Sequence, residues 1–93
     1  MLIGTVKVEL YLPGTCSLKE KRFVLKSLIT KIQNRFNVSV AEVEFQDKWQ
    51  KVCLGIACVS NDRRFLDSTL SKVLNTITQE DRAEIIDQVT EIL

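Results

Sequence analysis

Residues 17–36 read SLKEKRFVLKSLITKIQNRF, and the local signals in this stretch agree on one long helix. Ser17 and Glu20 fit a capping box, in which the Ser17 hydroxyl accepts an amide of the first turn while the Glu20 carboxylate reaches back to the Ser17 N–H. The apolar residues then fall within one arc about 100° wide, which must face a core. They are Leu18, Leu25, Leu28, Ile29, Ile32 and Phe36.

Basic side chains lie beside this arc. Lys19, Arg22 and Lys26 share one flank of the helix, and Arg35 follows further along. Lys21 falls near the arc itself, but in the first turn, where its long side chain can still reach water. These cations could contact phosphates by exchanging condensed counterions for ion pairs, or they could be an ordinary solvated helix face. A solvated face is the commoner of the two, and phosphate binding is the functional hypothesis for all five.

The composition indicates one globular domain over residues 1–93. Hydrophobic residues make up 45% of the chain and charged residues 27%. The net charge of +1 excludes strong attraction of the whole molecule to nucleic acid or to an anionic membrane, so any such binding must rest on a local patch. No apolar run approaches the roughly 18 residues of a membrane span, and residues 1–4 lack the basic start of a secretory signal. We expect a cytoplasmic protein with no membrane partner.

The sequence also argues against most catalytic sites. It contains no histidine, which removes Ser-His, Cys-His and imidazole-metal sites. Cys16, Cys53 and Cys58 fit neither a disulfide framework nor a zinc motif. Because Cys53 and Cys58 are five residues apart, they point to opposite faces of one strand. Cys16 stands just before a helix N-terminus, where the helix dipole could make it reactive, or it is a plain loop residue.

Two glutamates are the remaining candidates for catalysis. Glu42 and Glu44 occupy alternate positions of a predicted strand, so they share a face near Asp47 and could form a carboxylate pair. The alternative is a solvated or ion-paired acidic face. With no histidine and no glycine-rich phosphate loop beside them, we predict that the protein is not an enzyme and uses no metal or cofactor.

Alternating apolar residues predict strands at 2–12, 38–45 and 49–59. Pro13-Gly14 stops the first strand, and the short polar segment 46–48 predicts an antiparallel hairpin between the other two. The covered face of the first strand carries Leu2, Gly4, Val6, Val8, Leu10 and Leu12, and that of the third carries Val52, Leu54, Ile56 and Cys58.

A second helix follows, capped by Ser60 or Asn61 and ended by residues 78–81. Residues 83–93 fit a helix about as well as an irregular strand. The architecture favours a strand, because a β-α-β-β-α unit leaves its first strand with a free edge that a fourth strand covers. The prediction is an α+β fold: a ferredoxin-like βαββαβ sandwich, with a four-stranded, mainly antiparallel sheet and two helices on one face.

Such a sheet has one face that the helices do not cover. Ile3, Tyr11 and Val59 lie there with Gly55 and Ala57, whose small side chains would let a neighbour approach the backbone closely. An apolar strip of this kind often marks a contact, so it predicts at least a weak homodimer, through this face or through an exposed edge strand.

The predicted hairpin turn carries a second candidate site. Trp49, with Asp47 and Gln50, could stack on a base or anchor a partner protein. The alternative is that the tryptophan closes one end of the core.

Several blocks together resemble the YlxP-like family of small bacterial proteins. These blocks are Leu12-Pro13-Gly14, the run from Ser17 to Arg22, the run from Phe36 to Glu42, Trp49-Gln50, and the run from Val59 to Asp62. The resemblance implies a ferredoxin-like fold and a bacterial cytoplasmic protein without an established activity, often encoded beside translation and ribosome-maturation factors. Similar sequences often have histidine where this chain has Phe45, so no proton-transfer or metal role is expected at that position.

Two functions of different classes follow. One is a noncatalytic binding module that meets RNA or a ribosomal subunit through the basic first helix. The other is a homo-oligomeric interaction domain that uses the open sheet face and has no nucleic-acid role. No small-molecule ligand is predicted.

Overall fold

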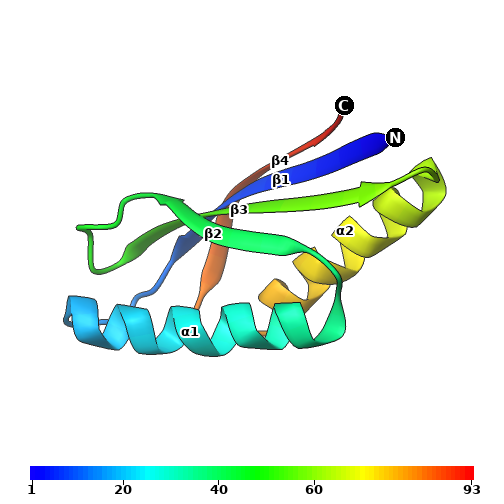
Figure 1. Ribbon diagram of the computed structural model, residues 1–93. Helices are drawn as coiled ribbons and strands as arrows, with labels where there is room; N and C mark the ends of the chain where they lie inside the picture. The colour runs from blue at the N-terminus through cyan, green and yellow to red at the C-terminus, as the bar shows by residue number, and fades with distance from the viewer.

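The computed structural model describes residues 1–93 as one four-stranded sheet with two helices on the same side (Figure 1). The strand order across the sheet is β2-β3-β1-β4, and every neighbouring pair is antiparallel. This arrangement confirms the predicted ferredoxin-like sandwich, including a strand for the last segment. The elements are β1 (Leu2–Tyr11), α1 (Leu18–Arg35), β2 (Ser39–Glu44), β3 (Lys51–Ser60), α2 (Arg63–Thr78) and β4 (Glu84–Ile92).

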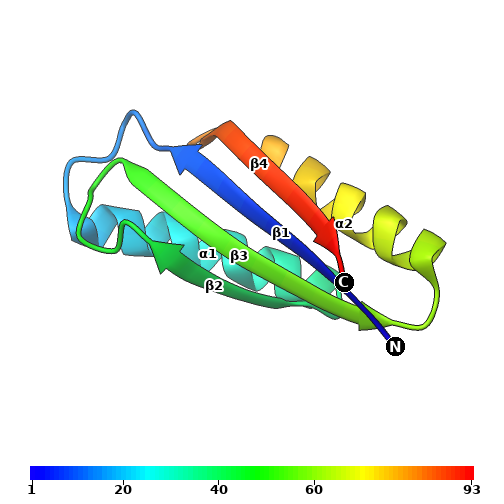
Figure 2. The same cartoon turned by 90° about the horizontal axis from the view of Figure 1, so that it is seen from above.

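β1 lies inside the sheet although it begins the chain (Figure 2). It pairs with β3 along its whole length, from Leu2 opposite Ser60 to Tyr11 opposite Lys51. On its other side it pairs with β4, and just past the end of β4 Leu93 exchanges two backbone hydrogen bonds, of 3.1 and 2.7 Å, with Ile3 of β1. The two termini therefore lie at the same end of the molecule (Figure 2).

The core lies between the sheet and the helices. Alternate residues of β1 and β3 point into it, as the sequence predicted, and α1 and α2 cover them with their apolar stripes. Gly4 lets α2 approach β1, because a methyl group at this position would lie 2.9 Å from Leu70 Cδ1. Fully buried members include Val8, Leu10, Leu28, Ile32, Val52, Leu54, Leu66, Val73 and Ile77.

Side-chain caps fix the starts of both helices, although not entirely as predicted. Ser17 Oγ accepts the Glu20 N–H at 3.1 Å, whereas the Glu20 carboxylate accepts the N–H of Cys16, at 2.7 Å, and not that of Ser17. The backbone at Ser17 is extended, which brings the Cys16 N–H close to the Glu20 carboxylate in the first turn of α1.

The cap of α2 is Asp62, so the prediction of Ser60 or Asn61 was wrong. Asp62 Oδ1 accepts the N–H groups of Arg64, at 2.9 Å, and Phe65, at 3.4 Å. A carboxylate both fills the cap and opposes the positive end of the helix dipole. Ser60 instead accepts the N–H of Asp62, which places the start of the helix after it. Neither helix is long and apolar enough to cross a membrane.

Candidate nucleic-acid interface

Three exposed cations of α1 form the centre of the candidate interface. Lys19, Arg22 and Lys26 follow one another at three- and four-residue spacing, so they lie along one side of the helix over about 10 Å. We call these three residues the basic ridge. None of them takes part in an ion pair, so their charges are free to attract an anion. The ion pairs of the structure are Lys7–Glu44, Lys21–Glu42 and Arg82–Glu80.

Lys21 does not belong to this surface, and the expectation that its side chain reaches water was wrong. It is 1% exposed. Its Nζ donates to the carbonyl oxygens of Phe45, at 2.6 Å, and Lys48, at 2.7 Å, and lies 2.7 Å from Glu42 Oε2. Because Lys21 falls within the apolar arc, its side chain points under the β2–β3 hairpin. Carbonyl groups of the hairpin accept hydrogen bonds from its ammonium group there. Lys21 is a structural residue and is not available to a phosphate.

Arg35 is exposed in the last turn of α1, but on a different side of the helix. At about 100° per residue it lies roughly 160° around the axis from Lys19. The side that carries the basic ridge continues instead through the uncharged Thr30 and Gln33. The candidate phosphate site is therefore shorter than the sequence suggested.

Phe23 is the residue that the sequence reasoning missed. Its side chain is 70% exposed, and it lies roughly 40° around the helix from Lys19. An aromatic ring therefore stands in water beside the basic ridge. The sequence held a signal for it, because Phe23 is a large apolar residue outside the apolar arc of the helix.

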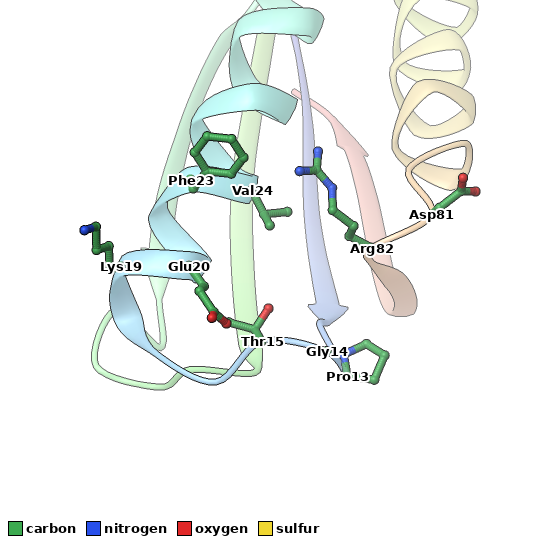
Figure 3. Close-up of a pocket in the computed structure, with 9 residues that line it drawn as sticks. All are labelled: Pro13, Gly14, Thr15, Lys19, Glu20, Phe23, Val24, Asp81 and Arg82. Atoms are coloured by element: carbon green, nitrogen blue, oxygen red, sulfur yellow. The ribbon is translucent and has the colours of Figure 1, made fainter.

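A hollow of about 690 Å³ opens next to Phe23 (Figure 3). One wall is α1, with Lys19, Phe23 and Val24, and the opposite wall is the turn after α2, with Asp81 and Arg82. The loop from β1 to α1 closes its lower end (Figure 3). The remaining lining residues are Pro13, Gly14, Thr15 and Glu20.

A buried carboxylate holds Arg82 at the edge of this hollow. Glu80 Oε1 accepts from Arg82 Nε at 2.7 Å, and Glu80 Oε2 accepts from Nη2 at 3.1 Å. The hydrogen bond from the Arg82 side chain holds the pKa of Glu80 below its usual range, although burial opposes the shift. The second contact of Nη2 is Ser27 Oγ on α1, at 3.4 Å, so Arg82 also links the two walls.

The hairpin between β2 and β3 carries Trp49, Asp47 and Gln50. Trp49 is 55% exposed, so it does not close the core and is available to a partner. Gln50 Nε2 donates to the carbonyl oxygens of Pro13, at 3.2 Å, and Thr15, at 3.3 Å, which ties the hairpin to the loop before α1. Asp47, Trp49 and Gln50 do line one shallow surface hollow together.

Glu42 and Glu44 do not form the carboxylate pair that the sequence allowed. The register of β2 against β3 shifts between them, because Glu42 pairs with Leu54 whereas Glu44 pairs with the adjacent Cys53. The extra residue turns the two side chains to opposite faces. Glu42 meets Lys21 beneath the sheet, and Glu44 Oε1 lies 3.3 Å from Lys7 Nζ. No group of three His, Cys, Asp or Glu side chains is placed to hold a metal ion.

The open sheet face is less open than the sequence suggested. Val43 occupies the space above Gly55, where a methyl group would lie 2.9 Å from Val43 Cγ1. The backbone at this glycine is therefore already covered by the chain itself and is not open to a second copy. Cys53 is fully buried on this face, and burial raises the pKa of its thiol. Val59 remains exposed, and a hollow of about 450 Å³ runs over Ala57. Ile3 is half-buried and Tyr11 is exposed.

These features define a small ferredoxin-like domain whose first helix carries three exposed, unpaired cations beside an exposed aromatic ring. The chain belongs to the family described as Protein of unknown function (DUF503), which it matches over residues 3–90. It is 45% identical over 73 residues to Uncharacterized protein YlxP of Bacillus subtilis (strain 168), covering 78% of this chain and 79% of that protein. The resemblance to the YlxP-like family is thereby confirmed.

Solved structures share the fold at low sequence identity. A de novo designed protein with ferredoxin fold, LFR1 1, superposes with a TM-score of 0.64 at 15% identity, over 98% of this chain and 86% of the designed chain. Protein YJCS superposes with a TM-score of 0.61 at 12% identity, over 96% of each chain. At these identities the likeness concerns the fold alone, and a shared fold does not imply a shared function.

Proposed function

We propose that this protein is a noncatalytic module that binds RNA, free or within a ribonucleoprotein such as a ribosomal subunit, through the basic ridge. The observation that carries the proposal is the row of three exposed, unpaired cations beside the exposed ring of Phe23. Unpaired cations at helical spacing can follow a phosphate backbone, and each phosphate contact releases condensed counterions. An exposed aromatic ring adds a surface on which bases stack.

Changing Lys19, Arg22 and Lys26 together to glutamine tests the proposal. For three phosphate contacts on single-stranded RNA, the slope of log K against log salt should become shallower by roughly 2, and affinity near 0.1 M salt should fall roughly 10- to 100-fold. Fluorescence anisotropy of a labelled RNA across a salt series measures both quantities. The fold should persist, because none of the three side chains is buried.

A matched control removes the same charge from a different surface. Arg63, Arg64 and Lys72 are exposed on α2, and changing all three to glutamine should leave RNA affinity near that of the parent. Equal losses in the two triple variants would mean that net charge alone governs binding, and no loss in the ridge variant would contradict the proposal.

A second candidate function is self-association through the open sheet face. The hollow over Ala57 favours it, because the surrounding surface includes the exposed apolar side chains of Val59 and Val89. Ala57→Lys would place a charge at the centre of that surface. If the face joins two copies, light scattering should show a concentration-dependent dimer for the parent and a monomer for the variant, with unchanged melting. A monomeric parent at the highest concentration would exclude this function.

A further inference from the structure

We propose that the hollow beside Phe23 receives an unpaired nucleobase of the same RNA whose phosphates lie on the basic ridge. This inference rests on the proposed function and specifies the form of RNA that the site takes: single-stranded segments or loops in preference to duplex. Lys19 and Phe23 belong at once to the ridge side of α1 and to the wall of the hollow, so one strand can reach both.

The wall of the hollow suits the flat face of a base. Phe23 supplies an exposed ring, and Val24 and Pro13 add apolar surface beside it. Bases stack on aromatic side chains whatever their sequence, because every base has a π-face. The volume of about 690 Å³ lies in the range of small-molecule pockets and is ample for one base.

The polar groups of the hollow suit the edge of a base better than a phosphate. Glu20 lines it, and its charge would repel a phosphate, whereas the Asp81 carboxylate points away from the hollow (Figure 3). Glu20 Oε2 accepts the Cys16 N–H, but Oε1 accepts no hydrogen bond within the chain and can accept one from the amino or imino group of a base. Arg82 supplies donors: its Nε and Nη2 are held by Glu80 and Ser27, whereas its Nη1 makes no hydrogen bond within the chain. The phosphates therefore stay outside, on the basic ridge.

Duplex RNA cannot satisfy this arrangement. Its bases are stacked and paired, and proteins read their edges chiefly where loops and single strands splay them out. A duplex would contact the basic ridge through phosphates alone and leave the hollow empty. The protein should therefore bind a short single strand of mixed sequence more tightly than the duplex made from that strand.

Phe23→Ala, measured against three RNA probes, tests the inference. The probes are a short single-stranded RNA of mixed sequence, its duplex, and an abasic strand with the same phosphates. The variant should bind the intact single strand about 5- to 150-fold more weakly, the range for losing one base–aromatic stack. Its affinity for the duplex and the abasic strand should match the parent, and its salt slope should be unchanged. Phe23→Tyr should retain the affinity.

Phe65→Ala is the matched control, because Phe65 is 56% exposed on α2 and does not line the hollow. It should bind all three probes as the parent does. If Phe23→Ala loses nothing on the intact strand, or loses equally on the abasic strand, the base-binding inference is overturned while the role of the basic ridge stands. If the ridge variant also binds as the parent does, the proposed function fails with it.

Discussion

Replacing Lys21 with alanine should lower the free energy of unfolding by about 3 to 5 kcal/mol, as expected when one partner of a buried ion pair is removed. The side chain is 1% exposed, and its ammonium group meets Glu42 and the carbonyl oxygens of Phe45 and Lys48. Without it, the buried Glu42 Oε2, which has no other polar partner in the chain than the Lys21 ammonium group, would be left without its cation. Urea denaturation followed by circular dichroism measures the loss.

The contacts of Lys21 also hold a strained turn. Phe45 has a φ of 64°, in the left-handed region that is unfavourable for a bulky residue, and its carbonyl group accepts from both Lys21 Nζ and the Lys48 N–H. Its ring lies 5.1 Å from Lys51 Nζ. Loss of Lys21 should therefore speed amide hydrogen exchange in residues 45–50 first.

Two further variants separate the charge from the packing. Lys26→Ala removes an exposed lysine from the same helix and should change stability by no more than about 0.5 kcal/mol. The double variant Lys21→Met, Glu42→Leu leaves no buried charge and should recover part of the loss. If Lys21→Ala instead unfolds at the urea concentration of the parent, the buried position of its ammonium group is incorrect.

Leu28→Ala should cost about 2 to 5 kcal/mol, because it removes a large aliphatic side chain from the packed space between α1 and the sheet. Leu28 is fully buried, and the same loss is expected for Ile56 on the opposing sheet face. For a domain of this size, such a loss lowers the midpoint of thermal unfolding by roughly 10 to 30 °C. Calorimetry checks the shift.

The exposed side of the sheet provides the comparison for this prediction. Val89 is half-exposed on β4, and Val89→Ala should melt within a few degrees of the parent. If Leu28→Ala had the same midpoint of thermal unfolding as Val89→Ala, the assignment of Leu28 to the core would be contradicted.

Most of the fold was predictable because local pattern and tertiary structure agree. The alternation in β1 and β3 and the stripe of α1 each match one covered face. β4 is the exception: most of its residues are exposed, so its pattern is weak, and only the free edge of β1 indicated a strand. That indication came from topology, which constrains a chain even where its local sequence does not.

The site was less predictable, because long side chains take their direction from partners that are distant in sequence. Lys21 is buried only because the hairpin brings two carbonyl groups and Glu42 to it. The side chains of Glu42 and Glu44 point to opposite faces of the sheet because β2 contains one extra residue against β3. Neither the burial of Lys21 nor the extra residue in β2 can be predicted from the spacing of charged residues in the sequence. Phe23, by contrast, was readable as an apolar residue on the polar side of a helix.

The position of β1 inside the sheet also determines the order in which the chain can fold. β1 comes first in the sequence, yet both of its partner strands belong to the second half of the chain. Only the β2–β3 hairpin joins consecutive strands, so it can form early, whereas capture of β1 and then of β4 must close long loops, which slows folding relative to a helical bundle. Until β4 pairs, β1 presents an unpaired edge, and the partly folded chain is then most prone to aggregate.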